Sequence, residues 1–314
     1  MPTAPDRVEG LARRVLAGDR RALGRALSLA ETDDAAGAAL CRRIGRFPTV
    51  APVLGFTGAP GAGKSTLVNA YVALLRGEGL TVAVLAVDPT SPFTGGAILG
   101  DRIRMIEHLG DEGVFVRSLA AHGHLGGLTA TVDRLVALVD AAGWDRIVLE
   151  TVGTGQSETQ LADVADVNIM VMAPGQGDDV QVMKAGALEA ADILVVNKSD
   201  LPQANRVVRQ LGEMNRLAHG GGSPVPVISA VALDGRGVAE LHQCIAKRLA
   251  ARLPRGDADV ARRLLDEVGH RLRQRLANRH AAAVDSLCHD IRTGVISLHE
   301  GAAQLEALLL GTDR

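Results

Sequence analysis

The pattern of apolar positions divides the chain into three regions. From about Val8 to Gly45, apolar residues recur at three- and four-residue spacing between charged residues, which predicts amphipathic helices. From Val53 to about Leu253, short continuous apolar runs alternate with helical stretches, and from Asp257 onward the pattern is helical again. We therefore predict an N-terminal helical extension, a central domain and a C-terminal helical arm, over residues 1–50, 51–254 and 255–314.

The central region has the pattern of an α/β domain. Its apolar, β-branched runs are VLGFTG, TVAVLAVD, VFVRS, RIVLET, VNIMVMAPG, ILVVNKSD and VPVISA. Continuous rather than alternating apolar runs suit strands that are buried on both faces of a parallel sheet, and the intervening helices supply the crossovers. We predict a doubly wound, mostly parallel sheet whose ligand binds at the carboxyl ends of the strands.

Composition and charge exclude several classes of protein. The 34 Lys and Arg nearly balance the 36 Asp and Glu, and aromatic residues make up only 2% of the chain, so neither a basic surface nor stacking platforms for nucleic acid are indicated. The charged N-terminus lacks a signal-peptide core, and no run of about 18 apolar residues could span a membrane. We expect a soluble, cytoplasmic protein without a nucleic-acid or membrane partner.

The strongest motif is GAPGAGKST, which matches GxxxxGK[ST] between a predicted strand and a predicted helix. In such a P-loop, glycines let backbone N–H groups surround phosphate oxygens, and the helix N-terminus adds positive potential. Lys64 can bridge the β- and γ-phosphates, and the Ser65 hydroxyl can ligate Mg²⁺. We predict a P-loop NTPase domain that binds nucleotide through Gly58, Ala59, Pro60, Gly61, Ala62, Gly63, Lys64, Ser65 and Thr66.

A second motif, NKSD, follows the predicted strand ILVV. In guanine-specific P-loop proteins, the aspartate of this motif accepts hydrogen bonds from guanine N1–H and N2–H₂, a pattern that adenine cannot supply. We expect Asp200 to read the base, Asn197 to brace the loop and the stem of Lys198 to cover the ring face. The later segment VISAV resembles the backbone that contacts guanine O6, through Ser229, Ala230 and Val231. Together these motifs favour GTP over ATP.

Acidic residues near predicted strand ends are candidates for metal and water. Asp88 ends TVAVLAVD, Asp101 follows the glycine-rich PFTGGAILG, and Glu150 ends RIVLE. Each alone is more often a helix cap or a loop acid, but beside a P-loop an acid at a strand end can hold Mg²⁺ directly or through water. The predicted metal ligands are Ser65, Asp88, Asp101 and Glu150, and the predicted catalytic residues are Lys64, Asp88, Asp101, Glu150 and Lys184.

Two further predicted loops contain residues that could bind a ligand or a metal. The segment Ala173–Gly186 is glycine-rich and charged, so it is a candidate nucleotide switch with Asp178, Asp179, Gln181 and Lys184, or alternatively a plain connector. His122 and His124 form an H-x-H pair, which without a nearby cysteine or acidic partner set is more often structural or solvated than a metal site.

The C-terminal region carries an apolar stripe in which Val260, Leu264, Val268, Leu272 and Leu276 recur every four residues. Between residues 241 and 280, ten Lys and Arg oppose four acids. A helix packed on its own domain, a dimerisation arm and a docking surface for an acidic partner are all compatible with this pattern.

In these motifs, the chain resembles the MeaB/ArgK family of P-loop GTPases. The stretches that carry the resemblance are GAPGAGKSTL, AVDPTSPFTGGAILGDRIRM, ETVGTGQSE, PGQGDDVQVMKAG and NKSD, of which the second is the most specific. The chain departs from the family pattern at Thr154, where an apolar residue is frequent, and at Ala62, where Val is frequent, and neither departure affects the assignment.

The resemblance implies a GTPase chaperone for an adenosylcobalamin-dependent acyl-CoA mutase, especially of the methylmalonyl-CoA mutase type. Such proteins gate cofactor loading, protect the mutase and are typically homodimers. The resemblance implies that Asp101 lies in a first switch, Glu150–Gly153 in a second and Asp178–Lys184 in a third. It implies Mg²⁺ and GTP or GDP as ligands and leaves no cobalamin site assigned on this chain.

Two alternative functions remain open at this point. A nickel-delivery GTPase for a metalloenzyme would need a Cys/His cluster, which Cys41, Cys244 and Cys288 do not make in the sequence. An ATP-dependent kinase of a transport protein is a competing label for similar chains, and NKSD argues against it.

Overall fold

A computed structural model describes residues 4–32, 34–44, 50–89, 108, 110–121, 128–151, 164–175, 190–218, 225–251 and 279–310, with scattered residues between 260 and 276. The chain divides into two compact units, one formed by residues 1–122 and 131–254, the other by residues 123–130 and 255–314. The first unit therefore holds the predicted N-terminal extension and, apart from residues 123–130, the predicted central domain.

Three helices make up the N-terminal extension, namely α1 (Ala4–Leu16), α2 (Arg20–Thr32) and α3 (Asp34–Ile44). Each contacts the other two. The apolar positions at three- and four-residue spacing fall on the inner faces, where Val15, Leu23, Leu27 and Leu40 are fully buried or nearly so. The predicted helical extension is confirmed.

The central domain contains a seven-stranded sheet in which all the strand pairs are parallel. The strands follow the order β3-β2-β4-β1-β5-β6-β7 across the sheet. The predicted doubly wound fold is confirmed, and the described strands are entirely rather than mostly parallel. Their bounds are β1 (Val53–Thr57), β2 (Val82–Pro89), β3 (Val114–Ala121), β4 (Arg146–Thr151), β5 (Val167–Met172), β6 (Ile193–Val196) and β7 (Val227–Ser229).

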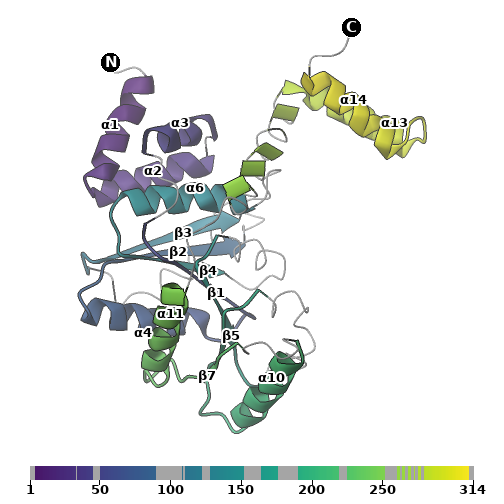
Figure 1. Ribbon diagram of the computed structural model, residues 1–314. Helices are drawn as coiled ribbons and strands as arrows, with labels where there is room; N and C mark the ends of the chain where they lie inside the picture. The colour runs from purple at the N-terminus through teal and green to yellow at the C-terminus, as the bar shows by residue number, and fades with distance from the viewer. Residues whose placement is uncertain are drawn as a thin grey trace. The chain divides into compact units, whose positions relative to one another are not determined.

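Helices cover both faces of this sheet (Figure 1). On one face lie α4 (Lys64–Gly77) and α11 (Val238–Ala251), which contact each other, and on the opposite face lie α6 (Leu128–Ala141) and the N-terminal helices. The helix α10 (Ala204–Ala218) packs beside β6 and β7. Because the strands are buried on both faces, Leu54, Phe56 and Val148 lose all contact with solvent, which explains their continuous apolar runs.

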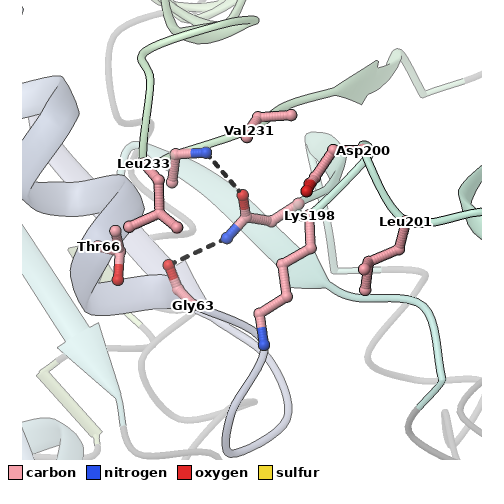
Figure 2. Close-up of a pocket in the computed structure, with 9 residues that line it drawn as sticks. Gly63, Thr66, Lys198, Asp200, Leu201, Val231 and Leu233 are labelled. Carbon is pink, nitrogen blue, oxygen red and sulfur yellow. Dashed lines mark hydrogen bonds between the residues drawn. The ribbon is translucent and has the colours of Figure 1, made fainter.

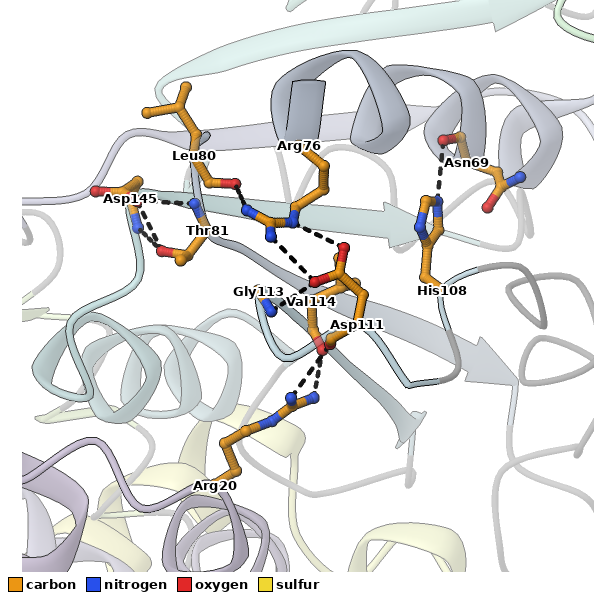
Figure 3. A network of polar contacts seen from close by, with 10 residues as sticks. All are labelled: Arg20, Asn69, Arg76, Leu80, Thr81, His108, Asp111, Gly113, Val114 and Asp145. Atoms are coloured by element: carbon orange, nitrogen blue, oxygen red, sulfur yellow. Dashed lines mark hydrogen bonds and ion pairs between the residues drawn. The ribbon is translucent and has the colours of Figure 1, made fainter. Parts of the chain in front are cut away.

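A polar network connects the start of β3, at the edge of the sheet, to the helices α2 and α4 (Figure 3). The Arg76 guanidinium on α4 donates two hydrogen bonds to the Asp111 carboxylate, at 2.9 and 3.0 Å, and a third to the Leu80 carbonyl at 2.7 Å. From α2, Arg20 donates to the backbone carbonyls of Asp111, at 3.2 Å, and Val114. Asp111 therefore connects the P-loop helix and the N-terminal extension at the start of β3.

Replacing Asp111 with asparagine is expected to lower the free energy of unfolding at neutral pH. The Arg76 hydrogen bonds, with help from the Gly113 N–H, lower the pKa of Asp111 below its ordinary value of 3.8. A carboxyl whose pKa is lowered on folding contributes stability above its unfolded pKa and loses that contribution as the pH falls through its folded pKa. The gap between wild type and Asp111→Asn should therefore close at acidic pH.

Urea denaturation of both proteins between about pH 7 and about pH 3 measures this gap. Glu213→Gln is a suitable control because Glu213 is an exposed carboxyl on α10. A difference between wild type and Asp111→Asn that stays constant over the whole range would contradict the role of the ionised carboxylate.

The second unit contains a helical hairpin of α13 (Ala281–Arg292) and α14 (Leu298–Leu310). A capping box starts α14, because the Ser297 N–H donates to Glu300 Oε2 at 2.7 Å and the Glu300 N–H donates to Ser297 Oγ at 3.2 Å.

Before this hairpin, the described residues from 260 to 276 are helical. In that stretch, the apolar stripe is exposed to solvent by 40%, 62%, 44% and 37% at Val260, Leu264, Val268 and Leu272. Among the described helices of both units, none is long and apolar enough to cross a membrane.

Candidate active site

The P-loop joins β1 to α4 through two backbone positions that only glycine fits. Gly58 has φ +138°, and a Cβ there would lie 1.9 Å from the Val171 carbonyl oxygen. Gly63 has φ +85°, and a Cβ there would lie 2.3 Å from Nδ2 of Asn197. These left-handed or crowded conformations fold the loop tightly against β5 and β6, so that its backbone curls over the N-terminus of α4.

Lys64 is the first residue of α4 and is only 6% exposed. Its Nζ donates hydrogen bonds to the carbonyl oxygens of Gly58, at 2.7 Å, and Ala59, at 2.9 Å. The first N–H groups of a helix have no acceptor within the helix, and the helix dipole adds positive potential at this end. The ammonium group and the helix terminus together make a site for phosphate oxygens.

Ser65 and Glu150 meet beside this loop. The Ser65 hydroxyl donates to Glu150 Oε1 at 2.5 Å, and the two residues are 6% and 4% exposed. Glu150 reaches this place because β4 pairs directly with β1, where Glu150 lies opposite Phe56. Hydroxyl and carboxylate oxygens are the ligands that Mg²⁺ prefers, so this pair fits a magnesium ion at the phosphate end of the site.

The buried side chain of Asn197 holds two loops together. From the end of β6, its Nδ2 donates to the Ala62 and Gly63 carbonyls of the P-loop, at 2.9 and 3.3 Å. Its Oδ1 accepts a hydrogen bond from the Ala232 N–H at 3.0 Å, in the turn that follows β7. The Asn197 amide therefore connects the P-loop, the end of β6 and the turn after β7.

Next to Asn197 a cavity of about 200 Å³ opens between the NKSD segment and the turn after β7 (Figure 2). Lys198 has φ +54°, and its Nζ donates to the Gly61 carbonyl at 2.8 Å, so its stem lies along the cavity. The Asp200 carboxyl is exposed at the same cavity. The lining residues are Gly63, Thr66, Asn197, Lys198, Asp200, Leu201, Val231, Ala232 and Leu233.

The structure brings many of the predicted residues into two adjacent groups. Lys64, Ser65 and Glu150 lie at the phosphate end, and Asn197, Lys198, Asp200 and Val231 lie at the cavity. Of the segment predicted to contact guanine O6, Val231 is among the residues that line the cavity, and Ser229 and Ala230 precede it in the chain. The Ala230 N–H donates to the Val196 carbonyl at 2.9 Å, which continues the sheet.

Three lining residues were not predicted from the sequence, namely Leu201, Ala232 and Leu233. Leu201 directly follows NKSD, and Ala232 and Leu233 are the two residues after Val231, so nearness to a predicted segment is the only signal that could have pointed to them. Ordinary apolar residues in a loop match no motif, so their role depends on the tertiary structure.

Other predicted residues lie outside the described part of the structure. Asp88 belongs to β2, but its side chain is outside the description. The remaining ones are Asp101, Asp178, Asp179, Gln181 and Lys184, and their roles stay predictions. The pair His122 and His124, to which the sequence assigns no site role, also lies outside the described residues. Within the described residues, no group of three or more His, Cys, Asp and Glu side chains is placed to hold a metal ion.

A family model described as methylmalonyl Co-A mutase-associated GTPase MeaB matches residues 23–285. The chain belongs to the MeaB family. The resemblance seen in the motifs is thereby confirmed. This MeaB-family chain, with its P-loop and its parallel sheet, is a P-loop GTPase that hydrolyses GTP.

Comparisons with individual proteins support the assignment to this family. A protein of Pyrococcus horikoshii that is named as a GTPase is 45% identical over 243 residues, covering 76% of each chain. The mouse methylmalonic aciduria type A homolog, a mitochondrial protein, is 43% identical over 147 residues, or 47% of this chain and 35% of that protein. A crystal structure titled LAO/AO transport system kinase matches with a TM-score of 0.64 and 26% identity, covering 96% of this chain and 97% of that one.

Proposed function

We propose that this MeaB-family GTPase is a chaperone for an adenosylcobalamin-dependent acyl-CoA mutase of the methylmalonyl-CoA mutase type. It gates cofactor loading and protects the mutase. The observation that carries the proposal is the family match over residues 23–285, because the family is described by its association with methylmalonyl-CoA mutase. The mouse relative, named for methylmalonic aciduria, supports the same client.

The reaction is attack of water on the γ-phosphate of GTP, in line with the leaving β-phosphate oxygen. Lys64 exchanges its two carbonyl contacts for phosphate oxygens, and the amides at the start of α4 donate to the same oxygens. Both interactions strengthen as negative charge develops. The buried position of Lys64 excludes water from its ammonium group and increases this effect.

Ser65 and Glu150 would hold Mg²⁺, with Asp88 and Asp101 as further candidates. When bound, the ion supplies charge neutralisation at the phosphate oxygens. The Ser65 hydroxyl donates a hydrogen bond to the Glu150 carboxylate at 2.5 Å, so the two oxygens are already adjacent, and a bound ion would replace this hydrogen bond. Asp200 orients the guanine edge, and Asn197 keeps its loop in register with the P-loop.

A homodimer is part of the same proposal. The exposed stripe of Val260, Leu264, Val268 and Leu272 supports it, because four apolar side chains at four-residue spacing form a continuous helical face that a second copy can bury. The cytoplasmic location expected from the sequence stays a prediction.

We expect the client mutase to accelerate GTP hydrolysis by about tenfold or more, which corresponds to about 1.4 kcal/mol of barrier. The physical reason is that a partner can stabilise the hydrolysis-competent arrangement of the switch segments predicted around Asp101, Glu150 and Asp178. The measurement is phosphate release by the purified protein, alone and with an adenosylcobalamin-dependent mutase from the same organism.

Lys64→Ala with the mutase is the matched control, because it reports any GTPase activity carried by the mutase preparation. Hydrolysis that the mutase leaves unchanged at saturating concentration would remove the client assignment and leave the GTPase intact. The nickel-delivery alternative would then be tested by nickel binding, and the kinase alternative by comparing ATP and GTP in a binding titration.

A further inference from the structure

A histidine on α11, His242, forms polar contacts with two points of the P-loop helix α4. Its Nδ1 lies 3.1 Å from the hydroxyl of Tyr71, a completely buried residue of α4. Its Nε2 lies 3.4 Å from Oε1 of Glu78, at the C-terminal end of α4. The rings of Tyr71 and His242 also pack together, with centroids 5.8 Å apart. One imidazole therefore connects α11 to both the middle and the end of α4.

The burial of Tyr71 determines which ring nitrogen of His242 carries the proton. Burial raises the pKa of Tyr71 above its ordinary value of 10.0, so the hydroxyl keeps its proton and needs an acceptor. Among the residues that the structure describes, Nδ1 of His242 is the hydrogen-bond partner of this hydroxyl. The proton of the neutral imidazole then lies on Nε2, which faces Glu78. Neither nitrogen is left for a ligand, which indicates a role in positioning.

The two helices that His242 connects carry different walls of the cavity next to Asn197. Gly63 and Thr66, at the N-terminus of α4, line one part of it, and residues 231–233, in the turn before α11, line another. The Val238 N–H donates to the Gly235 carbonyl at 3.2 Å, so this turn runs directly into α11. Since α4 and α11 contact each other, their packing determines how the two walls stand relative to one another.

We propose that His242 is a positioning residue for nucleotide binding. By bonding to both Tyr71 and Glu78, it holds α11, and with it the turn after β7, in register with the P-loop helix. The inference rests on the proposed assignment of the cavity to the guanine base. It separates two requirements of binding, because the P-loop alone receives the phosphates, whereas the base also needs the correct packing of α11 on α4.

Two substitutions separate the two contacts of the imidazole. In His242→Asn the amide oxygen takes the place of Nδ1 and accepts from Tyr71, whereas His242→Gln reaches only the place of Nε2. His242→Gln and Tyr71→Phe are expected to bind GDP about fivefold more weakly than wild type, the usual effect of one lost hydrogen bond, and His242→Asn should bind it normally. All three should bind inorganic triphosphate as wild type does. Calorimetric titration of the full-length proteins, below their thermal midpoints, measures both affinities.

The pH dependence of GDP affinity provides a second readout. A protonated His242 has two donors, so the buried Tyr71 hydroxyl loses its acceptor, whereas an asparagine amide does not titrate. Between about pH 8 and about pH 5.5, the GDP affinity of wild type should therefore fall below that of His242→Asn. Of the described charged groups, Glu78 faces the ring from α4, and Arg146, at the start of β4, acts on Tyr71. On α11, the residues three and four positions before and after His242 are uncharged.

His299→Asn is the matched control, because His299 is an exposed histidine on α14. Normal GDP binding by His242→Gln and Tyr71→Phe, an equal loss of GDP and triphosphate affinity, or a constant ratio of wild type to His242→Asn over the pH range would overturn the proposal. If Asp200→Asn changes the base preference while the His242 variants behave as wild type, only the positioning role is wrong. If Asp200→Asn leaves the preference unchanged, the assignment of the cavity to the base is wrong, and this inference with it.

Discussion

Replacing Lys64 with alanine is expected to lower GTP hydrolysis at saturating GTP by about a hundredfold or more. The Lys64 ammonium is buried and lies at the N-terminus of α4, held by the Gly58 and Ala59 carbonyls of the loop that we propose binds the phosphates. Removing a preorganised donor from a site where negative charge develops typically costs that much in rate, because the surrounding dipoles cannot replace it.

Phosphate release under single-turnover and steady-state conditions separates the loss of hydrolysis from the loss of binding. Lys247→Ala is the matched control, because Lys247 is an exposed lysine on α11. The thermal midpoint of both variants should be compared, since Lys64 also closes the P-loop on itself. Turnover near the wild-type rate in a folded Lys64→Ala protein would refute the assignment of the phosphate site.

The second large effect is expected from Asp200→Asn, which should change the preference of the protein from GTP to XTP. In the proposed site, the Asp200 carboxylate is expected to accept hydrogen bonds from N1–H and N2–H₂ of guanine, whereas an asparagine amide would donate to the carbonyl oxygen that xanthine carries in place of the N2 amino group. A hydrogen bond to a charged group contributes about 1.5–3 kcal/mol, so GTP affinity should fall roughly a hundredfold. Because the exposed Asp200 carboxyl lines the cavity, the change is expected to act on the base rather than on the phosphates.

Competition among GTP, XTP and ATP for the same site measures the change. Glu240→Gln removes another exposed carboxyl, on α11, and should leave the preference unaltered. Unchanged selectivity for GTP in Asp200→Asn would refute the reading of the base by NKSD. The two predictions are independent, because Lys64→Ala should impair hydrolysis of whichever nucleotide is bound.

Much of the fold could be predicted because its signals are local. The strands β1 and β6 are short apolar runs typical of a sheet with both faces covered, and the helices α1 to α3 follow from their three- and four-residue spacing. The P-loop glycines and NKSD could likewise be recognised, because phosphate and guanine binding each require a fixed order of residues within a few positions.

The order of the strands could not be predicted in the same way. Placing β4 between β1 and β2 brings Glu150 to within 2.5 Å of Ser65, a residue that lies 85 positions earlier in the chain. The link between Arg20 and Asp111 spans 91 positions. Such contacts depend on how whole strands and helices pack, and no short pattern in the sequence predicts this packing.

By itself, the sequence determined the elements, the phosphate and base motifs and the family, because each of these depends on the chemistry of neighbouring residues. Only the tertiary structure decided that Asn197 joins the P-loop to the turn after β7, that Leu233 lines the cavity beside Asp200, and that the C-terminal stripe is exposed. The reason is that backbone geometry acts over a few residues, whereas burial and the meeting of side chains depend on residues that only folding brings together.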